Sequence, residues 1–576
     1  MAIRRISNSE IARILFEIAA YLDMDEVAFK PRAYERAAEA VDTSAEEVGD
    51  LYEREGFTGL KEIPGVGEGI AEKIEELLKT GHLEYYERLK KKIPVDLERL
   101  MRVEGVGPKT IKTLYKKLGI RTLEDLEKAA RAGKVRGLEH FGAKSEAKIV
   151  KGIAFVKGAG ARFRLGDVLP LIRKIEERFR NVKEVEKVAA AGSIRRWKET
   201  VGDADFLVVS SKPKKVMDFF LSMPEIVHVY ARGEAKSLAR LSNGMDIDLR
   251  VVPKESFGAA LHYFTGSKEH NVALRILAQK KGWKLNEYGI FKGRKYLAGR
   301  TEAEVYKKLG LLYIPPELRE NQGEIEAARE GRLPELVEYG SLRGDLQIQT
   351  NWTDGAHSIR EMAEEAKKLG LEYIVITDHT RDLAMAKGSD EKKLERQAKE
   401  IDEVNKKGKG VKVLKGAEVN IRKDGTLDIA DDALAKLDVV GAAVHSNFAM
   451  SRADMTKRII RAIENPHVDI LFHPTGRIIQ KREPYQVDME AVLKAAKKTG
   501  TVMEIDASPE RLDLKDEHIR LGVNIGVRFS IDSDAHSYQS MRLLEFGIGQ
   551  ARRGWAEAAD IVNTRALKEF LRLLKH

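Results

Sequence analysis

The chain has 576 residues, too many for one hydrophobic core, which predicts roughly three to five domains. Its 101 Lys and Arg residues exceed its 91 Asp and Glu residues by a formal charge of +10, which favours a polyanionic partner, with nucleic acid ahead of an anionic membrane surface. The absence of cysteine excludes disulfides and thiolate metal sites. No apolar run of about 18 residues and no apolar signal core are present, so a cytoplasmic protein without a membrane span is expected.

Up to about residue 160, apolar residues recur at spacings of three and four, as in IARILFEIAAYL, which predicts an all-helical region. One motif occurs twice there, as IPGVGEGIAEKI at 63–74 and VEGVGPKTIKTL at 103–114, with a looser copy, HFGAKSEAKI, at 140–149. A Gly-x-Gly turn that opens a helix directs backbone N–H groups at a phosphate. A single copy would be an ordinary helix connection, whereas two copies favour sequence-independent DNA binding. The candidate DNA contacts are Gly65, Gly67, Gly105, Gly107 and Lys109.

From about residue 182 the apolar period becomes two, which predicts a mostly antiparallel sheet. In GDADFLVV, Asp203 and Asp205 lie two apart on a strand and share one face, and Asp248 in DIDLRVV can join them. Three clustered carboxylates repel one another unless divalent cations neutralise them, as in two-metal phosphoryl transfer. Upstream, Ser193 and Arg196 in GSIRRW offer a hydroxyl and a guanidinium suited to phosphate oxygens. An Asp-x-Asp pair alone is a common structural feature, but its combination with GS-x-RR and a third Asp favours catalysis.

Beyond residue 340, seven short apolar runs alternate with helical stretches, which predicts parallel strands with crossover helices in a closed or nearly closed barrel. Polar residues come at or just past the ends of these runs, the face at which barrel enzymes have their active sites. Capping or a satisfied core histidine explains any one of them, but their number predicts a site for two or three metal ions. The candidate ligands are Asp354, His379, Glu418, His445, His473, Asp534 and His536. Three other histidines are expected to be structural: His357, His467 and His518.

Taken together, these motifs resemble those of the bacterial and archaeal X-family DNA polymerases, in which a polymerase beta-like core is joined to a PHP phosphoesterase domain. GS-x-RR followed by GDADFLV is similar to the palm motif of that family, YFTGS at 263–267 to its nucleotide-binding turn, and LNEYGIF at 285–291 to a strand near the thumb. The resemblance covers nearly the whole chain. It implies a lyase-like helical domain with the first helix-hairpin-helix (1–90), a fingers-like helical domain with the second (91–160), a palm nucleotidyltransferase domain (161–255), a thumb-like domain (256–316), a linker (317–340) and a PHP domain (341–576).

The resemblance also assigns roles in the polymerase site. Asp203 and Asp205 would hold two Mg²⁺ or Mn²⁺ ions, and Asp248 would complete the site by helping to activate the primer 3′-hydroxyl. The incoming nucleotide would be bound by residues of the two turns, with triphosphate contacts from Ser193, Arg196 and Gly202, a sugar pocket of Tyr263, Phe264 and Gly266, and a base contact from Asn271. Arg275 would face the templating strand.

A lyase is implied as well. Lys73 occupies the position of the family's Schiff-base nucleophile for removal of 5′-deoxyribose phosphate, with Glu72 beside it and Tyr34 in the preceding helix. A solvated, phosphate-binding lysine is the competing interpretation. The second lysine of the polymerase beta pattern is absent, because Gly69 stands in its place.

The PHP resemblance implies a 3′–5′ exonuclease or 3′-end-processing site that uses Mn²⁺ or Zn²⁺. Its first motif departs from the family, since Gln347 and Gln349 stand where His-x-His is expected. A neutral amide oxygen is a much weaker ligand for these metals than imidazole, so partial metal occupancy and an impaired nuclease are expected.

The sequence therefore predicts a template-directed DNA polymerase that fills short gaps during repair, including base excision repair. Its expected partners are gapped or nicked DNA and deoxynucleoside triphosphates, with no membrane partner, and a monomer is expected. Two alternatives are a DNA-end-binding scaffold, which the intact Asp203, Asp205 and Asp248 oppose, and a PHP nuclease with a vestigial polymerase, which Gln347 and Gln349 oppose.

Overall fold

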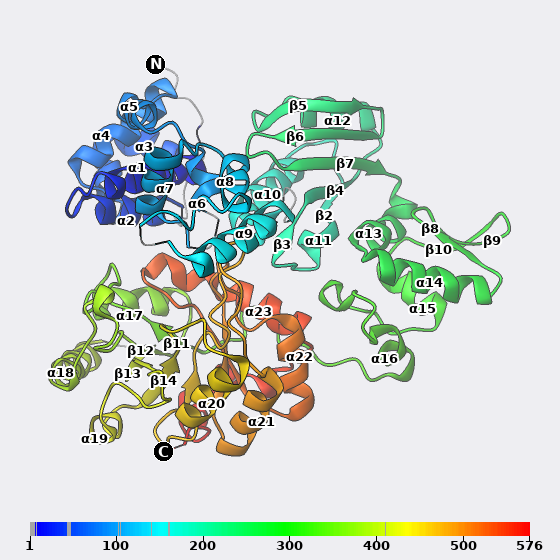
Figure 1. Ribbon diagram of the computed structural model, residues 1–576. Coiled ribbons are helices and arrows are strands. Elements are labelled where there is room, and N and C mark those ends of the chain that lie inside the picture. Colours follow the sequence, from blue (N-terminus) through cyan, green and yellow to red (C-terminus); the bar gives the residue numbers. More distant parts are fainter. Residues whose placement is uncertain are drawn as a thin grey trace.

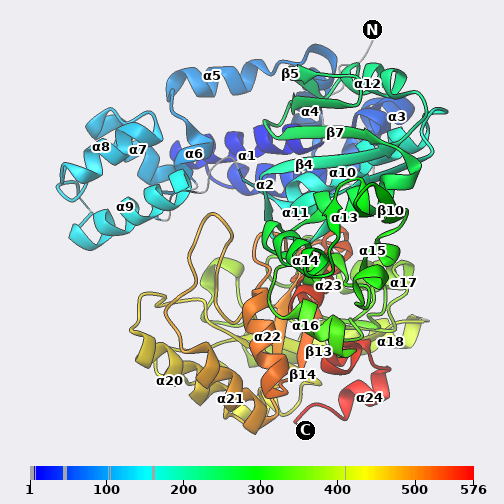
Figure 2. The ribbon, with the colours of Figure 1, turned by 90° about the vertical axis from the view of Figure 1, so that its right-hand side faces the viewer.

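The structure is a computed structural model that describes residues 6, 8–42, 48–101, 103, 105–139, 141–158, 162–408 and 410–575. His140, in the looser third copy of the glycine turn, lies outside these residues. Figures 1 and 2 show a helical N-terminal region, a central sheet with a smaller helical and hairpin region beside it, and a C-terminal barrel beneath them. In the described part of the chain, no helix is long and apolar enough to cross a membrane.

The N-terminal region is all-helical, as predicted, and its buried apolar residues form one cluster from Ile11 to Ile153. The two glycine turns have the same backbone hydrogen bond. Val66 N–H donates to Ile63 O over 3.0 Å, and Val106 N–H donates to Val103 O over the same distance. The helices are α1 (Asn8–Met24), α2 (Lys30–Asp42), α3 (Val48–Glu62), α4 (Glu68–Thr80), α5 (Glu84–Lys92), α6 (Leu97–Met101), α7 (Pro108–Leu118), α8 (Leu123–Arg131) and α9 (Ala143–Gly158).

The central sheet has the strand order β2-β4-β7-β6-β5, in which only the β4–β7 pair is parallel. Phe179 of α10 and Phe220 of α12 pack in one buried cluster with Phe206 and Val208 of the sheet. The elements are β1 (Phe163–Arg164), α10 (Leu165–Arg180), β2 (Lys187–Ala190), α11 (Gly192–Arg195), β3 (Thr200–Val201), β4 (Asp203–Val209), α12 (Pro213–Leu221), β5 (Ile226–Arg232), β6 (Lys236–Leu241) and β7 (Asp246–Val252).

A second, smaller core follows the sheet. It collects apolar residues from three helices and a three-stranded sheet, and it also includes Ile325 and Ala328 of α16 and Trp555 from near the end of the chain. The elements are η1 (Lys254–Ser256), α13 (Phe257–Thr265), α14 (Lys268–Lys280), β8 (Lys284–Asn286), β9 (Gly289–Lys292), β10 (Lys295–Ala298), α15 (Glu302–Leu309), η2 (Pro316–Leu318) and α16 (Glu324–Glu330). The chain between the thumb-like and barrel regions is therefore packed against both.

The C-terminal region is the predicted parallel barrel, with strands in sequence order from β11 to β17. A bridge between Ile348 and Ala535 joins the first strand to the residues just after the last and nearly closes it. The strands are β11 (Gly344–Ile348), β12 (Tyr373–Ile376), β13 (Lys412–Asn420), β14 (Val439–Ala443), β15 (Ile470–Leu471), β16 (Val502–Asp506) and β17 (Phe529–Asp532).

Helices surround this barrel, and one covers the end at which its strands begin. Phe570 of that helix stacks on Tyr373, the first residue of β12, with ring centroids 5.1 Å apart. The opposite end is thus left for the polar residues. The helices are α17 (Ile359–Lys368), η3 (Ala384–Ala386), α18 (Glu391–Lys407), α19 (Asp431–Leu434), α20 (Arg452–Ile463), α21 (Met489–Thr499), α22 (Asp516–Ile525), η4 (Tyr538–Leu543), α23 (Leu544–Arg553), η5 (Ala558–Asp560), η6 (Val562–Thr564) and α24 (Leu567–Leu571).

Candidate functional site

The parallel pairing of β4 with β7 brings the palm carboxylates together. Asp205 is the direct register partner of Asp248, and Asp203 lies two residues away on the same face as Asp205. Asp203 in turn pairs with Asp246, but Asp246 is held by Arg240 through two contacts of 2.8 and 3.1 Å. The three predicted residues therefore lie together at this end of the strands, beside the paired Asp246.

Within this set, Asp205 has too little positive charge around it, although Asp248 is paired with Arg250 and with Lys236 at 3.5 Å. Burial and then the charges of Asp203 and Asp248 raise the pKa of Asp205 from 3.8 to about 7. Asp248 Oδ2 accepts from Arg250 at 3.1 Å, but its buried Oδ1 has no hydrogen-bond partner among the described residues. A Cβ at Gly192 would lie 2.3 Å from Asp205 Oδ2, so a side chain there would collide with the carboxylate. An orphaned carboxylate oxygen beside an acidic neighbour of raised pKa fits a divalent cation.

The two nucleotide-binding turns predicted from sequence lie side by side. Arg196, which follows α11, donates through Nη1 to the carbonyl of Thr265 at the end of α13. Gly266 has φ 73°, a conformation that favours glycine, and a Cβ there would lie 3.0 Å from Arg196 Nη1. Ser193 lies on α11 itself and is half-buried. The fold thus brings Ser193 and Arg196, two of the predicted triphosphate contacts, next to the predicted sugar pocket.

The predicted sugar and base contacts are connected through α13 and α14. Asn271 Nδ2 donates to the carbonyl of Tyr263 over 2.6 Å, and the Tyr263 and Phe264 rings meet edge-on with centroids 5.0 Å apart. Arg275 lies one turn beyond Asn271 on α14 and is half-buried. Gly202 lies between β3 and β4, where a Cβ would be nearest to Arg162, at 3.9 Å, rather than to the residues of α13 and α14.

An ion-pair network that the sequence motifs do not predict links the nucleotide turn to the thumb-like region. Arg195 makes a two-pronged contact with Glu302 of α15, at 2.8 and 2.7 Å. Arg319 donates to the same carboxylate over 2.5 Å and is fully buried. Burial alone would raise the pKa of Glu302, but Arg195 and Arg319 hold it at about 2.

In the helical region, Lys73 lies on α4 and is half-buried. Its Nζ donates to the carbonyl of Gly69 over 2.8 Å and lies 4.9 Å from the centre of the Tyr85 ring. Tyr34 is buried, and burial, with the nearby Tyr85, raises its pKa above the ordinary value. Glu72 is exposed.

The two predicted phosphate turns present their glycines at helix starts. Gly67 and Gly107 are the N-caps of α4 and α7, and no side chain caps either helix. Gly65 and Gly105 have φ of 78° and 81°, a region that favours glycine. Lys109 is exposed in the first turn of α7. The free N–H groups of both helix starts are thus available to an anion.

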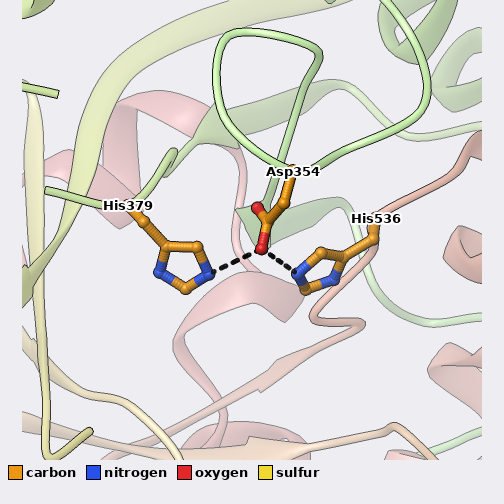
Figure 3. A group of neighbouring side chains, drawn as sticks. All are labelled: Asp354, His379 and His536. Carbon is orange, nitrogen blue, oxygen red and sulfur yellow. Dashed lines mark ion pairs between the residues drawn. The ribbon is translucent and has the colours of Figure 1, made fainter. Parts of the chain in front are cut away.

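In the barrel, the predicted ligands gather at the end where the strands stop. Asp354 Oδ2 lies 3.7 Å from His379 Nε2 and 3.8 Å from His536 Nε2, and Figure 3 shows both imidazoles directed at this carboxylate. These three residues form one group with metal-ligand geometry. A second group joins His379 to Glu418 and His445, so His379 is common to both.

Glu418 is the centre of the barrel site. Its Oε1 lies 2.9 Å from the Nε2 atoms of both His445 and His473, and its Oε2 lies 3.4 Å from His379 Nδ1. Burial alone would raise the pKa of this carboxyl, but the surrounding imidazoles hold it well below its usual range. A hydrogen bond to Asn420 orients His445, because Asn420 Oδ1 lies 2.7 Å from Nδ1, the ring nitrogen that does not face Glu418.

The two glutamines also bind Glu418, and they do so through their amide nitrogens. Gln347 Nε2 donates to Glu418 Oε2 over 3.2 Å, and Gln349 Nε2 donates to the same atom over 2.8 Å. Gln349 Nε2 also reaches Asp534 Oδ1 at 3.3 Å, while its own carbonyl accepts the hydroxyl of Thr377 at 3.1 Å. Two amide donors thus lie where the sequence pattern predicts metal-binding imidazoles.

Of the remaining barrel residues, Asp534 lies in the site and His357 lies outside it. Asp534 Oδ2 lies 3.7 Å from Arg511 Nε, a cation that the sequence motifs do not reveal because it is part of none of them. Asp534 also lies 3.9 Å from His536 Nδ1, through Oδ1. His357 is buried against Tyr538, with ring centroids 4.2 Å apart, and belongs to neither metal-ligand group.

Four domain families match segments of this chain. A helix-hairpin-helix domain matches residues 6–83 and a SAM-like helix-hairpin-helix tandem matches residues 97–154. The DNA polymerase beta thumb matches residues 260–320 and the PHP domain matches residues 345–545.

The chain is also similar to whole proteins. It is 38% identical over 576 residues to the DNA polymerase/3′-5′ exonuclease PolX of Bacillus subtilis, a match that covers 99% of each chain. It is 29% identical over 290 residues to rat DNA polymerase lambda, across 45% of this chain and 48% of that protein. It is 33% identical over 239 residues, 39% of this chain, to a probable phosphatase of Thermoanaerobacter sp., which is covered to 88%. The full-length identity shows that this chain belongs to the X-family DNA polymerases that carry a PHP domain, as the sequence motifs predict.

The raised pKa of Asp205 predicts a pH-dependent stability of the metal-free protein. Between 3.8 and about 7 the unfolded chain loses this proton while the folded chain keeps it, so stability falls as the pH rises through that window. Asp205→Asn is therefore expected to raise the melting temperature in EDTA more at pH 8 than at pH 4, and to abolish stabilisation by Mg²⁺. Asp246→Asn, at the paired carboxylate, is the control. An equal effect of Asp205→Asn at both pH values would contradict this account.

Proposed function

We propose that this X-family polymerase fills short gaps in DNA by nucleotidyl transfer at Asp203, Asp205 and Asp248. The observation that carries the proposal is the register of β4 and β7, which places three carboxylates together, with the pKa of Asp205 raised among them, beside the two predicted nucleotide-binding turns. In the reaction, the primer 3′-hydroxyl attacks the α-phosphorus of the nucleotide and pyrophosphate leaves. Two Mg²⁺ or Mn²⁺ ions held by this set would supply charge neutralisation for the reacting oxygens.

The chain's own residues would bind and orient the nucleotide. Ser193, Arg196 and Gly202 would contact the triphosphate, and the Tyr263, Phe264 and Gly266 turn would exclude a ribose 2′-hydroxyl. Asn271 and Arg275 would then face the nucleotide base and the templating strand. The support for this arrangement is the direct contact of Arg196 with the end of α13. Asp248 would accept the proton of the primer hydroxyl.

The helical region would hold gapped or nicked DNA without reading its sequence. Both glycine turns present uncapped backbone N–H groups, at Gly65 to Gly67 and at Gly105 to Gly107, and Lys109 adds a cation. Backbone contacts of this kind bind phosphates and carry no base information. We accordingly assign 1–90 and 91–160 to the lyase-like and fingers-like domains, 161–255 to the palm, 256–316 to the thumb, 317–340 to the linker and 341–576 to the PHP domain.

In the PHP site, we propose that the two glutamines replace a cation. The amide N–H groups of both glutamines donate to Glu418, and that of Gln349 also donates to Asp534, so hydrogen bonds supply part of the charge neutralisation that a Mn²⁺ or Zn²⁺ ion would supply if bound. The group of Asp354, His379 and His536 still fits an ion, because the buried Asp354 Oδ1 has no hydrogen-bond partner among the described residues. The 3′–5′ exonuclease is therefore impaired through partial occupancy of its metal site.

A second activity is favoured by the position of Lys73. Its amine is half-buried beside the Tyr85 ring and donates to a neutral carbonyl, that of Gly69. No carboxylate of the described residues forms an ion pair with it, so it is accessible to the aldehyde of an incised abasic site. We propose that Lys73 forms a Schiff base there and eliminates 5′-deoxyribose phosphate.

Asp205→Ala is expected to abolish nucleotide addition on a short gap with a 5′-phosphate. Loss of a carboxylate shared between two metal ions removes several kcal/mol of transition-state stabilisation, or about 10³-fold in rate. Asp246→Ala removes a carboxylate at the same sheet end that Arg240 already neutralises, and it should keep nearly full activity. Gap filling by Asp205→Ala at the wild-type rate would refute the assignment.

Replacing both glutamines by histidine is expected to restore the nuclease. Imidazoles at 347 and 349 would add two strong ligands beside Glu418 and Asp534, and metal affinity should rise by about 10- to 100-fold. Metal content and 3′–5′ exonuclease rate on single-stranded DNA are measured for both forms, with gap filling as the internal control. Equal exonuclease rates at full metal occupancy in both forms would show that the first PHP motif is dispensable.

Borohydride trapping tests the lyase. An incised abasic site should form a covalent adduct with the wild-type chain that Lys73→Ala loses, because the Schiff base forms on that amine. Lys79→Ala is the matched control on the same helix, since Lys79 is paired with Glu75 at 2.9 Å. Unchanged trapping in Lys73→Ala would move the nucleophile elsewhere.

A further inference from the structure

The turn that carries Arg196 is built against a helix of the barrel domain. Trp197, the next residue, has φ 53°, and its ring meets Phe546 of α23 edge-on at 5.7 Å between centroids. A Cβ at Gly549, nearly one turn further along α23, would lie 2.6 Å from the same ring, which leaves room only for glycine. Figures 1 and 2 show α23 on the side of the barrel that faces α11. The nucleotide-binding turn and the barrel thus share one packed contact.

Arg553, the last residue of α23, fixes this turn through its backbone and its charge. Its Nη1 donates to the carbonyl of Arg196 over 2.8 Å and to Glu320 Oε1 over 3.0 Å. Its Nη2 donates to Asp516 of α22 over 2.5 Å, and only 3% of the side chain is exposed. Glu320 Oε1 accepts Arg196 Nε as well, over 3.0 Å. One carboxylate oxygen is therefore shared between a nucleotide-turn arginine and a barrel arginine.

The charges at this junction do not cancel. Three cations, Arg196, Lys198 and Arg553, face two carboxylates, Glu320 and Asp516, so one positive charge remains. Burial alone would raise the pKa of Glu320, but the three cations hold it below its usual range. Burial and then the charge of Arg553 lower the pKa of Lys198, as expected where the local potential is positive.

We propose that Arg553 is a positioning residue for nucleotide binding, which shares Glu320 with Arg196 and so leaves the Arg196 guanidinium available to the triphosphate. The inference rests on the proposed role of Arg196 in the polymerase site. Without Arg553, Glu320 would pair more closely with Arg196, and the triphosphate would have to compete with a partly buried carboxylate. The barrel thereby contributes to polymerisation through charge, whatever the state of its own metal site.

Steady-state gap filling by the full chain tests this. Arg553→Met is expected to raise KM for the nucleotide about tenfold, since a charge-assisted contact is weakened, with little change in kcat. Adding Glu320→Gln to that variant removes the competing charge and should return KM close to the wild-type value. Inorganic tripolyphosphate, used as a competitive inhibitor, should lose and regain affinity in parallel. Arg553→Lys keeps the charge and should stay close to wild type.

Arg552→Met is the matched control. Arg552 precedes Arg553 on α23 and also ties the barrel to the rest of the chain, through Glu317 at 2.8 Å and the Val337 carbonyl at 2.8 Å. It reaches the turn only by packing, because its guanidinium lies 5.1 Å from the Tyr339 ring, which in turn lies 5.2 Å from the Trp197 ring. The variant therefore tests the packing of the turn without the charge of Arg553. The KM of the Arg552→Met variant for the nucleotide should be unchanged. If Arg553→Met fails to fold, Arg553→Gln, which keeps a donor but loses the charge, takes its place.

Three outcomes would overturn the inference: an unchanged KM in Arg553→Met, an equal rise in the double variant, or an equal rise in Arg552→Met. Arg196→Met separates this from the proposed function. If Arg196→Met raises KM and Arg553→Met does not, only the positioning role fails. If Arg196→Met leaves KM unchanged, Arg196 does not bind the triphosphate, and both its proposed role and the positioning role of Arg553 are wrong.

Discussion

A carboxylate taken out of water must be neutralised, and this one requirement organises the palm, the barrel and the junction between them. Desolvation penalises an isolated buried charge so strongly that the group either takes up a proton or acquires a cationic or hydrogen-bonding partner. The palm leaves Asp205 short of such a partner, which raises its pKa to about 7. The barrel surrounds Glu418 with imidazoles and amides, and the junction gives Glu320 three cations. These three solutions have different chemical consequences.

A group of carboxylates with too few cations around it favours the binding of a divalent ion, and the palm has such a group. In the barrel, the negative charge is reduced in two different ways. Near Glu418 the amides of Gln347 and Gln349 already occupy the carboxylate oxygen, so an ion would have to displace two hydrogen bonds. Deeper in the barrel, burial and mutual repulsion raise the pKa values of Glu504 and Asp506 well above the ordinary range. Hydrogen-bonded amides and carboxyls of raised pKa together lower the negative charge of this site.

Periodicity in the sequence predicted the face on which each set of site residues lies. Alternation placed Asp203 and Asp205 on one face of a strand, and strand ends placed His379 and His445 on one face of the barrel, because parallel strands all stop at the same end. Periodicity could not predict which atoms the glutamines would present. Gln349 directs its nitrogen at Glu418 because an ionised carboxylate can only accept hydrogen bonds, and its carbonyl then accepts from the hydroxyl of Thr377, which belongs to no motif.

The contact that joins Arg553 to Arg196 through Glu320 was equally beyond sequence reasoning. Its members are hundreds of residues apart and follow no repeat, so neither period nor spacing connects them. They meet only because α23 packs against the nucleotide turn, and that packing depends on the tertiary arrangement of two domains. A motif reveals residues that are close in the chain or repeated along it, and a junction of this kind is neither.

The junction shows how the barrel domain is joined to the proposed polymerase site. Trp197 needs the glycine surface of α23 to pack, and the Arg196 carbonyl needs Arg553 as a donor, so the nucleotide turn would be incomplete on an isolated palm. Neither contact involves a candidate metal ligand of the barrel. Glutamines at 347 and 349 therefore act on one end of the barrel, whereas the palm depends on a helix on its outer surface. The proposed polymerase site thus depends on barrel residues that are separate from the candidate metal ligands of the barrel.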